Sequence, residues 1–171
     1  MLLNLIIMTL IWLSSAFNYY LISYQLKYLE GDLYLNGIVS SLSETAAAVT
    51  SSVCLHFFGI KRGFIISFVI AAAGMVCLIY TDTDNQMLLA LFILGSKFGV
   101  TQAFNMSYVS NVLIFPTLLL ATSYGTCNIF ARLGTIFAPY VAELEPKVIS
   151  KWVFTAMMIL SIAVVFCLRV P

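Results

Sequence analysis

Residues 2–26 read LLNLIIMTLIWLSSAFNYYLISYQL, an uninterrupted run without a charged side chain. A transmembrane α-helix needs about 20 consecutive, mostly apolar residues, so this stretch is long enough to cross a bilayer. The whole chain has the same character, because 62% of its 171 residues are hydrophobic and only 9% are charged. A typical soluble domain carries roughly 25% charged residues. The sequence therefore predicts an all-α integral membrane protein.

Five further apolar segments follow, separated by short polar connections or, between the fourth and the fifth, by Pro116. The expected spans are residues 2–26, 33–58, 63–80, 87–108, 118–141 and 152–168. Pro139 is expected to bend the last turn of the fifth span, because proline lacks a backbone N–H. Gly95 and Gly99 have a spacing that allows another helix to approach the fourth span closely. Residues 1–171 are thus predicted to form one multi-pass bundle of six transmembrane helices.

Three charged residues lie inside these spans, namely Glu44, Lys97 and Arg132. A charge at mid-bilayer costs about 2.5 to 3.5 kcal/mol on insertion scales, so such residues usually face a bundle interior or a watery cavity. Glu44 has two interpretations: it orders the bundle by pairing with one cation, or it belongs to a binding site. One carboxylate neutralises only one of the two cations, and an anionic ligand would balance the other, for which we favour Arg132. Snorkelling or contact with backbone carbonyls is the alternative for Arg132.

Polar and aromatic residues accompany these charges at helical spacing. Tyr124 and Asn128 precede Arg132 by two turns and one turn, so the three side chains share a helix face. Tyr108 shares a face of the fourth span with Lys97 in the same way. The remaining candidates for an aromatic pocket also have a structural interpretation as core residues; they are Tyr19, Tyr20 and Phe104.

Several other classes of function lack support in the sequence. The formal net charge of +1 gives no basic footprint for nucleic acid. The four cysteines are far apart and form no CxxC pair, so neither a zinc site nor a disulfide framework is expected. No nucleophile, metal cluster or phosphate loop has a suitable spacing. We therefore expect no enzyme, no metal and no cofactor.

Three strings of residues resemble successive segments of one transporter family. Residues 131–140, ARLGTIFAPY, resemble the eleventh span of the organic cation and organic anion transporters of the major facilitator superfamily. Residues 31–36, GDLYLN, followed by SLSE at 41–44, look like the entry to that family's eighth span. Residues 115–117, FPT, are similar to the segment after its tenth span. Since order and spacing agree, the chain resembles spans seven to twelve, the C-terminal half of such a transporter.

The resemblance implies transport of a small organic ion, enclosed between this half and a second six-helix half in a plasma membrane. Arginine is usual at the position of Arg132 in the anion-transporting branch, so the resemblance favours organic anions. It also implies that Tyr19 and Tyr20 contribute to a pocket from the seventh span and Phe104 from the tenth. Lys97 is similar to the lysine of the family's tenth-span glycine–lysine motif. The carrier would be a fragment, a homodimer or one partner of a split pair.

Two departures from the family pattern leave a second function open. The family's acidic residue before the FPT segment is Leu113 here, and the arginine after that segment is Leu120. Both ends of an expected gate contact are therefore apolar, which would weaken coupling. Together with the expectation that an amino-terminal half is missing, these changes suggest the alternative of a transport-inactive structural subunit in a larger membrane complex.

Overall fold

The computed structural model describes residues 1–25, 33–80 and 86–168, and every regular element in these ranges is an α-helix. The prediction of an all-α fold is therefore confirmed. The first two residues of the GDLYLN motif, Gly31 and Asp32, lie outside the described residues. In chain order the helices are α1 (Leu2–Gln25), α2 (Leu33–Tyr80), α3 (Gln86–Ile114), α4 (Thr117–Thr135), α5 (Ala138–Ala142) and α6 (Lys147–Phe166).

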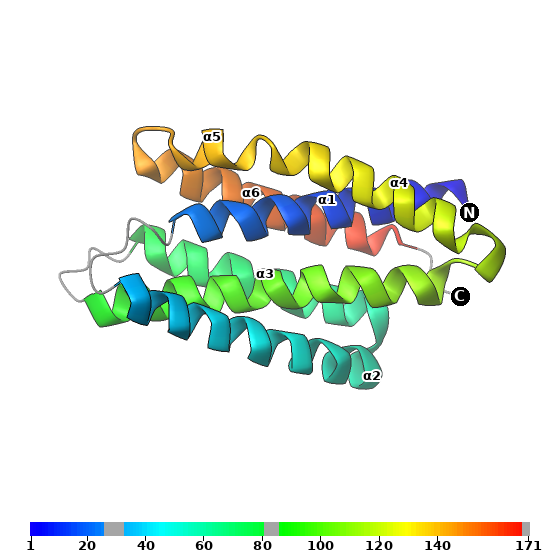
Figure 1. The fold of residues 1–171 in the computed structure, drawn as a ribbon, viewed down its shortest axis with the longest axis horizontal. Coiled ribbons are helices and arrows are strands. Elements are labelled where there is room, and N and C mark those ends of the chain that lie inside the picture. Colours follow the sequence, from blue (N-terminus) through cyan, green and yellow to red (C-terminus); the bar gives the residue numbers. More distant parts are fainter. Residues whose placement is uncertain (26–32, 81–85, 169–171) are drawn as a thin grey trace.

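The longest helix, α2, reverses its direction at Gly59. This residue has a φ of 74° and a ψ of 177°, and glycine adopts a positive φ without the steric penalty of a side chain. Residues 33–58 and 60–80 are therefore two helical segments, which Figure 1 shows running in opposite directions, the second one behind α3. They correspond to the second and third expected spans. The polar turn expected around residues 59–63 is reduced to a single non-helical residue.

The helices form an elongated bundle in which α1 has a central position. α1 packs against α3, α4, α5 and α6, while α2 packs against α3 and α6. Figure 1 shows the start of α1 and the end of α6 at the same end of the bundle. The core contains large side chains with almost no exposed surface, including Trp12, Phe64, Phe68, Phe154 and Met158. The described residues are thus held together by side chains that are buried between helices.

A small residue brings α3 very close to the second segment of α2. A Cβ atom placed on Gly99 would lie 2.6 Å from the Ala71 backbone nitrogen and 2.6 Å from the Ser67 carbonyl oxygen. A Cβ atom placed on Gly95 would have nothing within 4 Å. Of the two glycines predicted to permit a close helix approach, only Gly99 does so.

The fifth expected span, residues 118–141, contains two helices instead of one bent helix. α4 ends at Thr135 and α5 begins at Ala138. Pro139 explains the break, because it has no N–H to donate to the Thr135 carbonyl one turn earlier. The Phe137 N–H instead bonds the Gly134 carbonyl at 3.1 Å, which tightens the chain at this point.

Three helical segments of the described residues are long and apolar enough to cross a membrane, namely Leu2–Gln25, Ser40–Tyr80 and Val148–Phe166. Mean hydropathy is lower in α3 and α4 than in α1 and α6. Part of the reason is that polar residues such as Gln102 and Asn111 of α3 are buried within the bundle. The number of six membrane spans stays a prediction.

Candidate functional site

Lys97 is buried in the bundle and is neutralised by Glu44. Its Nζ atom lies 2.7 Å from Oε1 of Glu44 and donates a hydrogen bond to the Ser40 hydroxyl. The Lys97 side chain is 4% exposed and the Glu44 side chain is 33% exposed. The lysine comes from α3 and its two partners come from the first segment of α2, so the ion pair joins these helices. The geometry matches the interpretation in which Glu44 orders the bundle.

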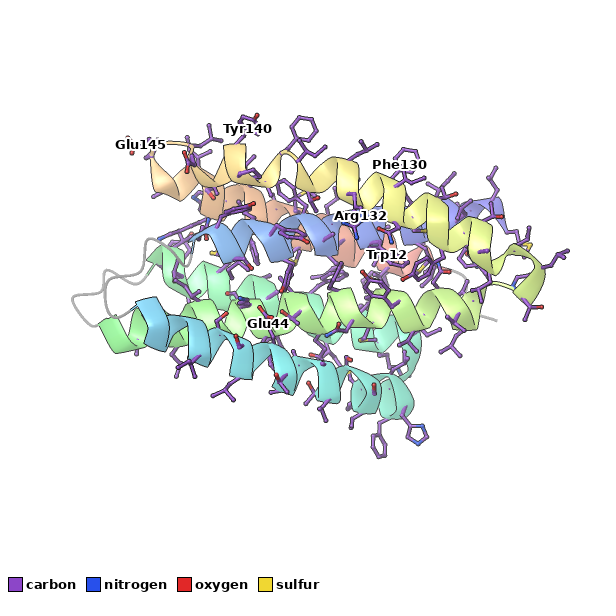
Figure 2. All side chains as sticks on the ribbon, in the orientation of Figure 1. Trp12, Glu44, Phe130, Arg132, Tyr140 and Glu145 are labelled. Atoms are coloured by element: carbon purple, nitrogen blue, oxygen red, sulfur yellow. The ribbon has the colours of Figure 1, made fainter. Side chains whose placement is uncertain are left out.

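Arg132 has a different environment from Lys97. It is exposed, and its Nε atom donates a hydrogen bond to the Asn128 side-chain oxygen at 3.0 Å. Figure 2 shows Arg132 directed toward the middle of the bundle, whereas Phe130 and Tyr140 point away from it. Within residues 1–25, 33–80 and 86–168, Arg132 takes part in no ion pair. The sequence left open which of the two cations pairs with Glu44, and in the structure Glu44 pairs with Lys97.

An aromatic row connects the surroundings of these two cations. The Tyr19 and Phe104 rings are stacked with centroids 5.5 Å apart, and the Phe104 and Tyr108 rings meet edge-on at 5.2 Å. Trp12 meets Tyr108 at 4.6 Å and Tyr124 at 5.2 Å, both in edge geometry. Aromatic pairs in these geometries contribute a favourable interaction energy in addition to the free energy gained by burying the rings. The row consists of Tyr20, Tyr19, Phe104, Tyr108, Trp12 and Tyr124, from α1, α3 and α4.

One end of the row lies near Lys97, and the other end lies on α4, the helix that carries Arg132. The Lys97 Nζ atom lies 5.8 Å from the Tyr19 ring centroid, within the range of a cation–π interaction. At the other end, Tyr124 lies on the same face of α4 as Arg132, two helical turns before it. Tyr20 is 39% exposed and Tyr124 is 36% exposed, so the row is open at both ends. The arrangement can hold an anionic group at Arg132 and an apolar or ring-shaped group beside it.

The sequence predicted most members of this arrangement but not Trp12. In the structure the Tyr19 ring contacts both the Tyr20 ring and the Phe104 ring. Trp12 precedes Tyr19 by seven residues, two turns of helix, and this spacing was the available signal that both share one face of α1. Tyr108 and Tyr124 were predicted only as companions of the two cations.

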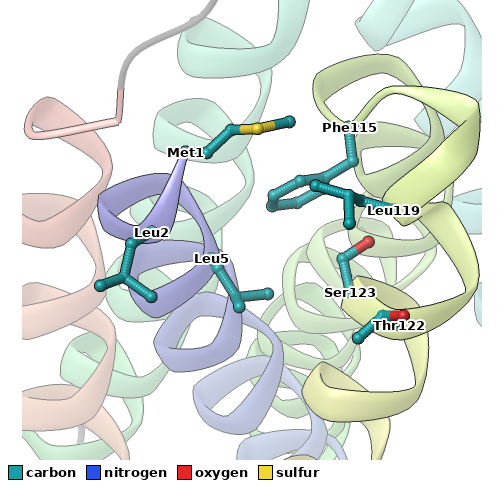
Figure 3. Close-up of a pocket in the computed structure, with 7 residues that line it drawn as sticks. All are labelled: Met1, Leu2, Leu5, Phe115, Leu119, Thr122 and Ser123. Atoms are coloured by element: carbon teal, nitrogen blue, oxygen red, sulfur yellow. The ribbon is translucent and has the colours of Figure 1, made fainter.

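A separate apolar pocket lies at the end of the bundle that holds Met1. Figure 3 shows the side chains around it, which come from the start of α1, the end of α3 and the start of α4. None of its lining side chains is charged, and most of them are apolar. The residues are Met1, Leu2, Leu5, Phe115, Leu119, Thr122 and Ser123.

The described residues contain no group of His, Cys, Asp and Glu side chains arranged to hold a metal ion. The four cysteines form no disulfide with one another; Cys54 and Cys127 are buried, and Cys77 and Cys167 are exposed.

Comparisons with known proteins identify the relatives of this chain. No protein-family model matches it. Solute carrier family 22 member 4 of Mus musculus is 33% identical over 138 residues, which cover 79% of this chain and 24% of the relative. Organic cation/carnitine transporter 2 of Homo sapiens is 25% identical over 135 residues, covering 79% of this chain and 24% of the relative. Solute carrier family 22 member 13 of Homo sapiens is 28% identical over 134 residues, covering 78% and 24% respectively.

The chain is thus a relative of the organic ion transporters of solute carrier family 22, within the major facilitator superfamily, and the resemblance inferred from its motifs is confirmed. Its matched region spans about a quarter of the length of these relatives. The relatives are transporters and not enzymes, which agrees with the prediction from the sequence. The relatives are integral membrane proteins.

Proposed function

We propose that this chain is one six-helix half of a carrier for small organic ions, with a preference for organic anions. The observation that carries the proposal is the contrast between the two cations. Lys97 is buried and already has a carboxylate partner, whereas Arg132 is exposed and is hydrogen-bonded only to a neutral amide among the described residues. A charge that the protein leaves uncompensated within a membrane bundle is a natural partner for an anion.

The proposed substrate contacts follow the aromatic row. Arg132 receives the anionic group, because a guanidinium binds a carboxylate through two parallel hydrogen bonds. Tyr19, Tyr20 and Phe104 receive the apolar part, with Trp12, Tyr108 and Tyr124 completing the surface. Lys97, one of the predicted substrate residues, is assigned here to the ion pair with Glu44. Asn128 belongs to the site through its hydrogen bond to Arg132.

The proposal includes a second six-helix half and a plasma-membrane location. In this superfamily two halves enclose a substrate near the middle of the membrane and rock to alternate its access. The partly exposed ends of the aromatic row, Tyr20 and Tyr124, support a surface that a second half would cover. The length of the relatives, about four times that of the matched region, is compatible with further helices. The membrane is assigned from the resemblance alone.

A second candidate function is a transport-inactive subunit of a larger membrane complex. It is favoured by Leu113, which is 55% exposed where the family pattern has an acid, and by Leu120 where the pattern has an arginine. Apolar residues at both positions are suited to permanent packing against another chain rather than to a charged gate that opens and closes.

Uptake of radiolabelled benzoate tests the carrier function. The tagged chain is extracted in mild detergent with its partners, reconstituted into liposomes and compared with Arg132→Ala. Charge-assisted hydrogen bonds contribute about 1.5 to 3 kcal/mol, so we expect Arg132→Ala to slow uptake at least about tenfold. The matched control is Arg62→Ala, which removes an exposed arginine from the second segment of α2.

The expected result is uptake by the wild-type protein and by the Arg62 variant, and its loss in a folded Arg132 variant. No uptake by the wild-type particle would overturn the carrier function and favour the structural subunit. Unchanged uptake by Arg132→Ala would overturn the role of Arg132. If that variant fails to fold while Arg132→Gln folds, the glutamine variant gives the same comparison; failure of both would assign Arg132 to packing.

A further inference from the structure

We propose that Asn128 is a positioning residue that orients the Arg132 guanidinium without neutralising it, and so selects ligands that carry a carboxylate. The inference rests on the proposed function and deepens it, because it names the ligand class at that site. In this role Asn128 acts on the ligand through Arg132 and does not make the direct ligand contact that the sequence predicted.

The geometry of the hydrogen bond decides which edge of the guanidinium is available. Asn128 lies one helical turn before Arg132, and its Oδ1 atom accepts the hydrogen of Nε at 3.0 Å. A guanidinium has five N–H donors in a fixed planar fork. With Nε engaged, the far edge keeps one N–H on each Nη nitrogen, and these two bonds are parallel. Within the described residues neither Nη atom has a hydrogen-bond partner.

The far edge of the fork fits the two oxygens of one carboxylate. Bidentate contacts between arginine and carboxylate combine charge with a planar geometry, which gives them specificity as well as strength. A lysine in place of Arg132 would lack this geometry, since an ammonium is a point charge. Tyr124 precedes Arg132 by two helical turns on the same face of α4, and its ring lies 5.9 Å from the Tyr108 ring, so a ligand that reaches from Arg132 to the aromatic row combines a carboxylate with an apolar or ring-shaped group.

Because residue 128 is an asparagine and not an aspartate, the positive charge of Arg132 is not neutralised. An aspartate four residues before an arginine on a helix would form an ion pair with it. At Lys97 a carboxylate does neutralise the cation: Glu44, on another helix, pairs with the ammonium, and the lysine is almost fully buried. At Arg132 the acceptor is neutral and the cation is exposed. We therefore assign Lys97 a structural role and Arg132 a role in ligand binding.

Equilibrium binding of radiolabelled benzoate to the native particle tests this role, with benzamide as a neutral probe of the same shape. The variants are Asn128→Ala, Asn128→Asp, Arg132→Ala and the double variant Asn128→Ala/Arg132→Ala. Thr126→Val is the matched control, because Thr126 lies on α4 and bonds only the Thr122 carbonyl of its own helix, at 2.8 Å. Thermal unfolding confirms that each variant is folded.

We expect Asn128→Ala to weaken benzoate binding about threefold to tenfold, because the fork is no longer held. Asn128→Asp keeps the acceptor but supplies a competing carboxylate, so we expect a loss of more than about thirtyfold for benzoate and little change for benzamide. In the Arg132→Ala background, Asn128→Ala should change benzoate binding less than about twofold, because residues that act as a unit are not additive.

Two results would overturn the inference alone. In the first, Arg132→Ala abolishes benzoate binding, but both folded Asn128 variants bind benzoate within twofold of the wild type. The other is an Asn128→Ala effect of equal size with and without Arg132, which would make Asn128 a direct contact. A wild-type particle that binds no benzoate would overturn the proposed function and this inference together.

Discussion

Replacing Gly99 by alanine is expected to push α3 away from the second segment of α2. The new methyl carbon would lie 2.6 Å from the Ala71 backbone nitrogen and from the Ser67 carbonyl oxygen. Both are backbone atoms, so no side-chain rotation can relieve the contact. Ordinary van der Waals contact begins at 3.4 Å, and the helices must therefore separate locally by about 0.8 Å.

The magnitude follows from a comparison with Gly95→Ala on the same helix. Alanine gains about 1 kcal/mol of helix propensity over glycine, and both variants receive this gain. Only the alanine at Gly99 is overpacked, which costs about 1 to 3 kcal/mol. The difference between the two variants isolates that cost. For a protein of this size each kcal/mol corresponds to about 2 to 4 °C, so the melting temperatures should differ by about 2 to 12 °C.

Thermal unfolding of the tagged protein, in one detergent and with its partners, measures the difference. The Gly95 variant is expected to melt at or slightly above the wild-type temperature and the Gly99 variant below it. If Gly99→Ala melted as high as Gly95→Ala, the close contact between α3 and the second segment of α2 would be refuted.

Three further predictions concern buried groups. Glu44→Gln leaves the Lys97 ammonium without its carboxylate, and because Glu44 is one-third exposed we expect a loss of about 1 to 3 kcal/mol in thermal unfolding. The double variant Glu44→Gln/Lys97→Met should recover part of this loss, and no recovery would contradict the ion pair. Asn111→Ala removes a buried acceptor that a serine hydroxyl reaches at 3.1 Å, so its thermal unfolding should show a cost of about 1 to 3 kcal/mol, and a neutral effect would argue against that hydrogen bond. In single-cysteine variants, a maleimide should label the exposed Cys167 in the native protein and Cys127 only after denaturation; equal labelling rates would show that Cys127 is accessible.

The sequence was informative wherever a single segment determines the outcome. Runs without charge predicted the helices, because a membrane helix is defined by its own length and composition. Gly59 was recognised as a boundary, although only the structure shows that this one residue suffices to reverse α2. The effect of Pro139 was predicted as a bend, whereas the lost hydrogen bond to Thr135 separates two helices.

The partners of the charged residues could not be predicted in the same way. Glu44 had two possible cations, and the choice depends on which helices pack together, a long-range property that helical spacing does not contain. The structure pairs Glu44 with Lys97 because α2 packs on α3. The hydrogen bond between Asn128 and Arg132 is local to α4, and its spacing of four residues was visible in the sequence. Predicting the role of Trp12 requires both its spacing within α1 and the packing of α1 against other helices, since its ring contacts lie on α3 and α4.

The proposal that this chain is half of a carrier is tested most directly by the mass of the native particle. The tagged chain, 18.9 kDa by itself, is extracted in mild detergent, and its partners are identified at the same time. A carrier half predicts a particle with twelve spans, made of this chain and a second six-helix unit, either another copy or a separate half. A much larger particle of fixed composition would contradict that assignment and identify the chain as a structural subunit.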